Sequence, residues 1–391
     1  MHSARCIMEK IWNKKFILLF ITNLLMMATF YGSVPILPIY CQEIGITGSK
    51  IGIVLTAMSV TTVLFRPFAG YLLDNFNRYH VFIICLALFS LPFLGFIIFP
   101  VFGMLVFIRL YMGVVYSVCG SATTTLAGDV LPLDKVTQGV NRFALTISLG
   151  MAFGPFIGIQ LQNHLSSKTS FLVLFVLVLA ALFCVSRCQI EYPKTEPKKF
   201  SLSAAFYKPA LPFMLNMIFI MIPFGAVIAY SSIFAQEKGF SSVIPYFYIF
   251  LVAGMLMSKF STQKLVDAGK HRVLVGVSLL VLLFTMAGYY FMRTAFYLLL
   301  AGLLLGVGYG ILQPLFQSFV TGTTPAPKRG AANATYLLSY DIGIGIGSFV
   351  MGMFHEGIGL SAGFSITAIA YLFGAVIYLL YTDKYYKKLR F

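Results

Sequence analysis

The stretch RPFAGYLLDNFNRYH, from Arg66 to His80, begins in one long apolar run, 51–73, and leads into the next, 81–99. Each run approaches the roughly 20 residues that a helix needs to cross a bilayer. The runs are continuous and do not alternate in polarity, which favours helices over barrel strands. The stretch therefore predicts a short charged turn between two membrane-spanning helices.

Apolar runs of this kind recur along the whole chain of 391 residues. Hydrophobic residues make up 59% and charged residues only 10%, whereas a soluble domain carries about 25% charged residues. Such a composition excludes an ordinary cytosolic enzyme, a disordered chain, a collagen and a disulfide scaffold. We expect twelve membrane helices, an even number that places both termini on one side. They are predicted at 16–40, 51–73, 81–99, 104–127, 143–161, 171–185, 211–234, 244–260, 273–291, 295–320, 332–354 and 364–381.

The positive charges fall mainly on one side of these predicted helices. The formal net charge is +16, and Lys and Arg cluster in short segments between the apolar runs, as in cytoplasmic loops beside anionic lipid. The loops on the side opposite the N-terminus carry only Lys50, Lys168, Lys238 and Arg293. The asymmetry predicts a multi-pass protein of the plasma (bacterial inner) membrane with both termini cytoplasmic. It also argues against nucleic-acid binding.

The two halves of the sequence resemble each other at an offset of 193 residues. Matching pairs include Asn23 with Asn216, Gly32 with Gly225, Tyr116 with Tyr309, Gly150 with Gly343 and Gly154 with Gly347. We therefore predict an N-terminal six-helix bundle over 1–187, a basic cytoplasmic linker over 188–209 and a C-terminal bundle over 210–391. Two parallel repeats are typical of transporters whose substrate site lies between the halves near mid-membrane.

The charged turn also resembles a known family signature. Gly70, Leu72, Asp74 and Arg78 match the loop motif G-x-L-x-D-x-x-x-R of the major facilitator superfamily. Asn77 stands where that family has a second glycine. Since Asn tolerates the left-handed conformation better than most residues, we expect the turn to survive. The resemblance implies an all-α polytopic membrane protein with the major facilitator fold, twelve transmembrane helices in two six-helix pseudo-repeats.

The same turn offers candidates for a conformational latch. A carboxylate beside a short loop can face a helix N-terminus or an Arg of the other bundle. Asp74, Arg78 and Asp129 are the candidates, with Gly70 shaping the turn and Asp267 marking a degenerate copy in the second half. We expect their contact to exist in one conformation and to break in the other. The alternative is loop charges that only obey topology and solvation.

The fifth predicted span carries GMAFGPFIG, residues Gly150–Gly158. Gly150, Gly154, Pro155 and Gly158 are similar to the antiporter motif of drug/proton exchangers in the same superfamily. The resemblance implies export by exchange. The alternative is ordinary helix packing, since small residues four apart let helices approach closely.

Two ionisable residues lie within apolar spans. Asp341 is the only carboxylate set deep in a span, and Arg109 has apolar residues on both sides. Ionisable residues at this depth are costly and usually functional, and they face the bundle interior or water. Asp341 could carry a proton, bind a cationic group of the substrate or pair with Arg109. The alternative is a carboxyl group that is hydrogen-bonded within the helix packing.

Polar, Pro- and Gly-bearing segments occupy corresponding places in spans one and seven, at 31–35 and 223–225. Interrupted helices in such places point to a binding region, so we expect breaks in both helices. A central cavity would then be lined by polar residues of several spans, with lipid contact and packing as the alternative reading. These candidates are Asn23, Tyr31, Asn216, Tyr230, Gln313 and Gln317.

Together these features predict a secondary active transporter that exports a small amphipathic compound or metabolite, by proton antiport with alternating access. Its expected partners are the substrate, protons and the lipid bilayer, and we expect a monomer. No enzyme chemistry, cofactor, metal or nucleic acid is implied. One alternative is a proton-coupled or facilitated uptake permease for a small polar solute. Another is a non-transporting membrane sensor or interaction protein on the same fold.

Overall fold

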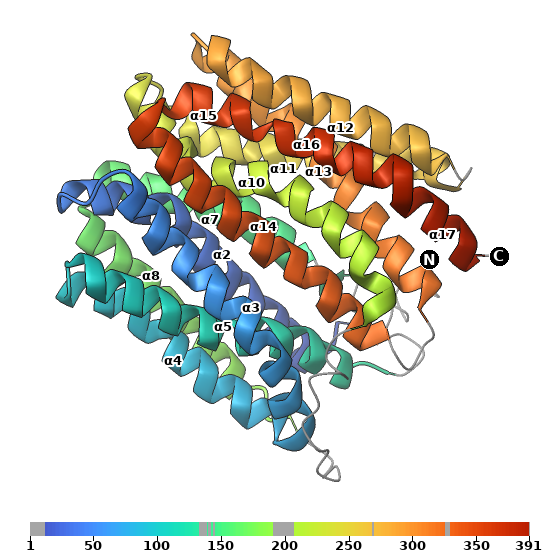
Figure 1. Ribbon diagram of the computed structural model, residues 1–391. Coiled ribbons are helices and arrows are strands. Elements are labelled where there is room, and N and C mark those ends of the chain that lie inside the picture. Colours follow the sequence, from blue (N-terminus) through green and yellow to red (C-terminus); the bar gives the residue numbers. More distant parts are fainter. Residues whose placement is uncertain are drawn as a thin grey trace, which may run out of the picture. The chain divides into compact units, whose positions relative to one another are not determined.

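The computed structural model describes residues 12–132, 139, 142–143, 145–190, 207–267, 270–324 and 329–390. All the elements within these ranges are helical (Figure 1). Most of the predicted linker, 191–206, lies outside them, as do Arg5, Lys10 and Lys135 among the loop cations.

The first half of the chain forms six long helices. These are α2 (Lys14–Glu43), α3 (Ser49–Asn75), α4 (Arg78–Ile98), α5 (Phe102–Asp129), α7 (Leu145–His164) and α8 (Ser167–Ser186). The second half begins with a 3-10 turn, η2 (Lys208–Ala210), and contains a second, η3 (Gly288–Phe291). Its long helices are α10 (Leu211–Glu237), α11 (Ile244–Asp267), α12 (His271–Ala287), α13 (Ala295–Thr323) and α14 (Arg329–Gly357).

The last membrane segment is built from short pieces: α15 (Leu360–Thr367), α16 (Ile369–Ile377), a π-helical segment η5 (Tyr378–Thr382) and α17 (Asp383–Arg390). Eleven helical segments in the described part are long and apolar enough to cross a membrane, and α11 supplies a shorter apolar stretch, Ile244–Ser258. Each of the twelve predicted spans coincides with one of these segments. The all-α membrane fold expected from the sequence is thereby confirmed.

The expected breaks in spans one and seven are wrong. α2 and α10 run without interruption through Tyr31–Pro35 and Pro223–Gly225. A proline removes only one helical hydrogen bond, and neighbouring helices can support the backbone around it. The glycines at these places serve close packing instead: a Cβ on Gly32 would lie 3.0 Å from the Gly154 carbonyl oxygen.

The expected role of Asn77 is also wrong. Its φ is −61° and its ψ is 106°, so it is extended and not left-handed. Its side-chain oxygen accepts hydrogen bonds from the backbone N–H groups of Tyr79 (3.0 Å) and His80 (3.2 Å). Asn77 therefore caps α4, a place that Asn fills well because its oxygen satisfies otherwise unpaired N–H groups.

The helices group into two compact units by their contacts. Unit 1 comprises Met1–Ile36 and Leu64–Phe200, and unit 2 comprises Leu37–Val63 and Ser201–Phe391. Within unit 1, α4 packs against α5 and α8; within unit 2, α10 packs against α14 and α11 against α13. The end of α2 and the beginning of α3 thus pack with the second half of the chain. The division of the protein at 188–209 stays a prediction.

Candidate functional site

A cluster of polar side chains lies where α13 and α14 meet α10 in unit 2. The Tyr336 hydroxyl donates to the Gln313 carbonyl oxygen at 2.8 Å and lies 3.3 Å from the Tyr340 hydroxyl. The Gln313 side-chain amide faces the Met221 sulfur at 4.0 Å. Tyr336 is fully buried, whereas Gln313 and Tyr340 are half-buried. Tyr336, Tyr340, Gln313 and Met221, which we call the tyrosine cluster, therefore bring together hydroxyl, amide and thioether groups from three helices.

Asp341 follows Tyr340 directly on α14 and is half-buried. It lies four residues before Gly345, and residues four apart share one face of a helix. A Cβ on Gly345 would lie 2.8 Å from the Cβ of Ser59 on α3. Along α14, Asp341 thus lies between Tyr340 and Gly345, the glycine that meets Ser59 of α3.

The crossing of α3 and α14, which we call the α3–α14 contact, involves residues 48–59 and 345–356. The Thr56 hydroxyl donates to the Gly345 carbonyl oxygen at 3.0 Å. Gly52 and Gly352 bring the two backbones together, since a Cβ on Gly52 would lie 3.3 Å from the Gly352 Cα. At one end of the contact, a side chain on Gly48 would collide with Glu356. Glycines thus let the backbones of α3 and α14 approach closely, with the small side chains of Thr56 and Ser59 packed at Gly345.

Tyr230, a predicted cavity residue, lies inside unit 2 near the same end of α14. It is fully buried, and its ring centroid lies 6.1 Å from that of His355. Among the described residues its hydroxyl has no hydrogen-bond partner. The neighbouring His355 forms a 2.8 Å contact between its Nε2 and the Glu237 carboxylate. The structure therefore places Tyr230 beside the α3–α14 contact rather than in the tyrosine cluster.

Arg109 and Tyr31 lie in unit 1. Arg109 on α5 is only 6% exposed, and its Nη1 lies 3.6 Å from the Met112 sulfur. Tyr31 on α2 is half-buried, and its ring centroid is 4.9 Å from that of Phe30. Gln317, a turn beyond Gln313 on α13, is half-buried in unit 2.

The two predicted asparagines are buried, and each bonds within its own unit. Asn23 donates to the Thr146 hydroxyl on α7 at 2.6 Å. Asn216 donates to the Thr382 hydroxyl in η5 and to the Pro212 carbonyl oxygen. Sequence reasoning missed both threonines. The signal was available, because a buried amide in a membrane helix needs a polar partner on a neighbouring helix.

The predicted antiporter motif lines the packing of α7 on α2. A Cβ on Gly150 would lie 2.5 Å from the Met27 Cβ, and a Cβ on Gly154 would lie 2.7 Å from the Ala28 carbonyl oxygen. A Cβ on Gly158 would collide with the Gly32 carbonyl oxygen. Gly150, Gly154 and Gly158 are buried, as is Pro155. At Gly154 and Gly158 a side chain would press on carbonyl oxygens of the α2 backbone, so only glycine fits there without moving α2.

The predicted latch is partly visible in unit 1. Arg78 Nη1 contacts both oxygens of Asp129, at 3.0 and 3.1 Å, and its Nε donates to the Leu73 carbonyl oxygen at 2.9 Å. Gly70 is exposed. The side chains of Asp74 and Asp267 lie outside the described part of the structure.

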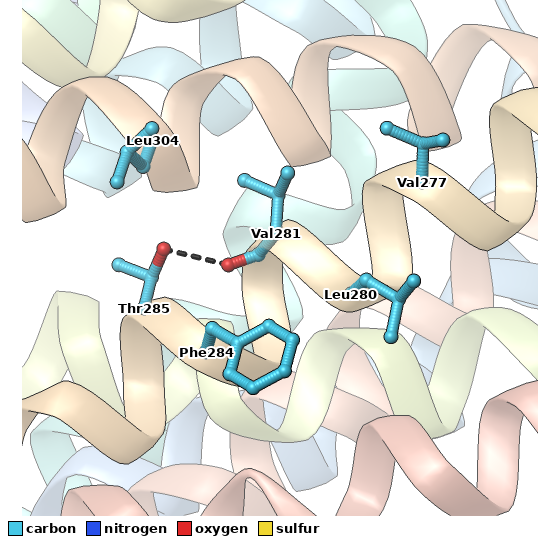
Figure 2. A pocket seen from close by; sticks show the side chains of 6 residues that line it. All are labelled: Val277, Leu280, Val281, Phe284, Thr285 and Leu304. Carbon is cyan, nitrogen blue, oxygen red and sulfur yellow. Dashed lines mark hydrogen bonds between the residues drawn. The ribbon is translucent and has the colours of Figure 1, made fainter.

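Two apolar hollows flank α12. The larger, about 390 Å³, is lined by Val277, Leu280, Val281, Phe284, Thr285 and Leu304, as Figure 2 shows. Neither hollow includes a predicted site residue. Within the described residues no group of three or more His, Cys, Asp or Glu could hold a metal ion.

The sequence model of the family described as the Major Facilitator Superfamily matches this chain over residues 19–320 and 263–390. The chain belongs to the Major Facilitator Superfamily. The family resemblance drawn from the charged turn is confirmed, and the family and fold are those of membrane transporters of small molecules.

Similar sequences include a protein that is named for quinolone resistance. Over 146 residues the chain is 27% identical to "Quinolone resistance protein NorA" of Staphylococcus aureus, which is 37% of this chain and 38% of that protein. The chain therefore spans less than half the length of these relatives. An uncharacterised MFS-type transporter of Methanocaldococcus jannaschii is 25% identical over 367 residues, covering 88% of this chain and 92% of that protein.

Solved structures share the fold over nearly the whole chain. A bacterial homologue of the human lysosomal transporter Spinster, in an inward-facing and unoccupied conformation, matches with a TM-score of 0.81. The identity is 14%, and the match covers 97% of this chain and 99% of that one. The nucleoside transporter NupG matches with a TM-score of 0.74 at 14% identity, covering 94% and 98%. Identities this low support the fold alone.

Proposed function

We propose that this Major Facilitator Superfamily transporter exports small amphipathic compounds in exchange for protons, with Asp341 as the coupling residue. The observation that carries the proposal is the place of Asp341, half-buried in α14 directly after Tyr340 of the tyrosine cluster. Burial disfavours the charged form of a carboxyl group, so a proton and a cationic substrate group compete for such a site. That competition is what antiport requires.

The tyrosine cluster supplies the groups that an amphipathic substrate needs. The Tyr336 and Tyr340 rings lie 5.6 Å apart at 77°, and aromatic faces attract cationic groups. Met221 is fully buried in this structure, and its flexible, polarisable side chain can repack against different apolar shapes. The Gln313 amide, which faces Met221, offers a hydrogen bond for orientation.

Export is favoured over uptake by two observations. The segment Gly150 to Gly158, which packs α7 on α2, resembles the antiporter motif of drug/proton exchangers. The partial relative NorA is named for quinolone resistance. A quinolone is therefore the first substrate to try.

The test uses the purified chain in proteoliposomes with a fluorescent quinolone and an imposed pH gradient. We expect quinolone movement against proton flow in the wild type, and loss of its pH dependence in Asp341→Asn. Glu43→Gln removes an exposed carboxylate at the end of α2 and serves as the matched control. Quinolone movement in the same direction as proton flow would favour the alternative, a proton-coupled uptake permease. If transport by Asp341→Asn keeps the pH dependence of the wild type, Asp341 has only a packing role.

Pairing of Asp341 with Arg109 stays a prediction, since the two residues belong to different compact units. If the pair forms, Arg109→Gln should impair transport, and Arg109→Gln combined with Asp341→Asn should be no worse than the poorer single variant. Additive losses would show that the two residues act independently.

For alternating access, we propose that the α3–α14 contact closes in one state and opens in the other. Spin labels at Thr47→Cys and Gly357→Cys, which are exposed beside the contact, should then show two distances whose populations shift with substrate or pH. Labels at Lys238→Cys and Gly357→Cys, on the packed pair α10 and α14, serve as the control and should stay constant. A single distance under every condition that supports transport would refute the opening.

We also infer that Arg78, Asp129 and Asp74 stabilise the outward-open state. Asp74→Asn should leave membrane insertion intact and shift the balance between the two label distances. A differential contact of about 1–3 kcal/mol would change the ratio roughly 5- to 150-fold. An unchanged ratio together with wild-type transport would leave these charges a purely topological role.

A further inference from the structure

A narrow apolar groove lies between α12 and α16, which run side by side in unit 2 (Figure 1). Its volume is about 220 Å³. Aliphatic side chains line both walls, including Leu280 and Leu283 on α12, Leu372 on α16 and Leu379 on η5. Arg272, at the beginning of α12, closes one end.

The length of the groove matches one leaflet of a membrane. From Arg272 to Leu283 the helical rise gives about 16 Å at about 1.5 Å per residue. The hydrocarbon of one leaflet is about 15 Å thick, half of a core of about 30 Å. An acyl chain lying in the groove would therefore run from the polar boundary at Arg272 to the middle of the bilayer.

Gly276 keeps the groove open. A Cβ on Gly276 would meet no heavy atom within 4 Å, and the residue is exposed. It differs in this from the glycines at helix contacts, such as Gly347, where a Cβ would collide with a neighbouring backbone. Within the described part of the structure, no neighbouring atom requires glycine at this position.

The charge at the polar end is positive. Arg272 is 56% exposed, and its Nε and Nη2 contact the Asp383 carboxylate at 2.8 and 2.6 Å. Lys387 Nζ contacts the same carboxylate at 3.0 Å. Asp383 is only 4% exposed, so one buried acid holds two largely exposed cations side by side. Further exposed cations nearby in the sequence are Lys270, Lys384 and Lys388.

The hollow on the other flank of α12 provides a contrast. It is larger, at about 390 Å³, but no charged residue lines it. Its one hydroxyl, on Thr285, already donates to the Val281 carbonyl oxygen at 2.6 Å (Figure 2). An acyl chain could cover that surface, but nothing there would select a headgroup. The groove that ends at Arg272 has both an apolar lining for an acyl chain and a cationic end for a headgroup.

We propose that the α12–α16 groove is a binding site for an anionic phospholipid, with one acyl chain beside Gly276 and the phosphate at Arg272. Anionic lipid attracts clustered Lys and Arg near the membrane surface. The site is separate from the transport proposal, since it includes neither Asp341 nor the tyrosine cluster.

The test measures lipid binding to the purified full-length chain in detergent by native mass spectrometry. The probes are dioleoylphosphatidylglycerol and, as the neutral lipid, dioleoylphosphatidylcholine. We expect the wild type to prefer phosphatidylglycerol. Gly276→Phe should fill the groove without displacing protein atoms and weaken that binding at least about fivefold. Gly103→Phe is the matched control, because a Cβ on Gly103 also meets nothing within 4 Å.

Arg272→Gln tests the headgroup and should remove the preference for phosphatidylglycerol over phosphatidylcholine. Soluble glycerol 3-phosphate tests whether the phosphate alone suffices, and it should not compete with the lipid. The proposal is overturned if the two lipids bind equally to the wild type, or if Gly276→Phe binds like Gly103→Phe. Competition by glycerol 3-phosphate would replace the lipid site with a site for free phosphate.

Discussion

The packing of α7 on α2 in unit 1 and the packing of α14 on α10 in unit 2 are two versions of one arrangement. A Cβ on Gly150 or on Gly343 would lie 2.5 Å from the Cβ of Met27 or Met221, respectively. The Phe30 ring lies 4.4 Å from the Tyr116 ring, and the Phe224 ring lies 4.6 Å from the Tyr309 ring. The repeat inferred from sequence is thus visible as repeated contacts inside each unit.

The two versions differ in register by one residue. The glycines on α7 and α14 are 193 residues apart, but their partners on α2 and α10, such as Met27 and Met221, are 194 apart. The polar contacts therefore diverge while the apolar ones repeat. Glycine packing tolerates such drift because it depends on backbone shape, whereas a hydrogen bond depends on the direction of one side chain.

The largest expected effect comes from adding a side chain to the glycines that pack α7 on α2 or α14 on α10. Gly158→Ala and Gly347→Ala each direct a methyl group at a carbonyl oxygen of the partner helix, and overpacking of this kind costs about 1–3 kcal/mol. The measurement is the thermal unfolding midpoint of each variant in detergent. Gly103→Ala, in open space, is the control and should not be destabilised.

The same two alanine variants also test whether the antiporter motif acts in transport or only in helix packing. If Gly158→Ala keeps its stability but loses export, the motif acts in transport and not only in packing. If both alanine variants keep full stability and full export, the inference that these helix contacts leave no room for a methyl group is wrong.

The second prediction concerns the tyrosines that correspond in the two units. The Tyr309 hydroxyl bonds to the Tyr371 hydroxyl at 2.5 Å, and both residues are at most 1% exposed. Tyr309→Phe leaves one buried hydroxyl without this partner and should cost about 1–3 kcal/mol. Tyr116 is half-buried, and its hydroxyl contacts the Met27 sulfur at 4.0 Å, so Tyr116→Phe should shift the unfolding midpoint less. Equal shifts in the two variants would contradict the difference between the units.

The third prediction tests the one-residue shift directly through double-mutant cycles. Asn23→Ala with Thr146→Val, and Asn216→Ala with Thr382→Val, should each show coupling of about 0.6–1 kcal/mol in unfolding free energy. Asn216→Ala with Ser339→Ala should be additive, although Ser339 corresponds to Thr146 at the offset of 193. Coupling to Ser339 would mean that Asn216 faces α14, as the sequence alignment alone suggests.

The smallest stability effect is expected at the loop charges. Arg78 and Asp129 form an exposed pair, with side chains 21% and 33% exposed, and such pairs contribute about 0–1 kcal/mol. Asp129→Asn should therefore barely move the unfolding midpoint, and added salt should remove what remains. Asp383→Asn, at a carboxylate that is 4% exposed and holds two cations, should lower the midpoint more. The reverse order would show that the exposed pair has the larger structural role.

The sequence by itself determined the number, length and helical nature of the membrane spans, because apolar runs of about 20 residues can satisfy their backbone in lipid only as helices. It also determined the family, since Gly70, Leu72, Asp74 and Arg78 sit at fixed intervals in one short turn. It found the close-packing glycines through their spacing of four. These are local properties, set by residues near one another in the chain.

Only the tertiary structure decided which neighbour each polar side chain meets. A shift of one residue rotates a side chain by about 100° around a helix. Asn23 therefore reaches Thr146 on α7, whereas Asn216 reaches Thr382 in η5. Likewise, Arg78 pairs with exposed Asp129, whereas Arg272 pairs with buried Asp383. Hydropathy averages over all faces of a helix and so fixes the span, but the face that each residue presents is set by the packing of the other helices.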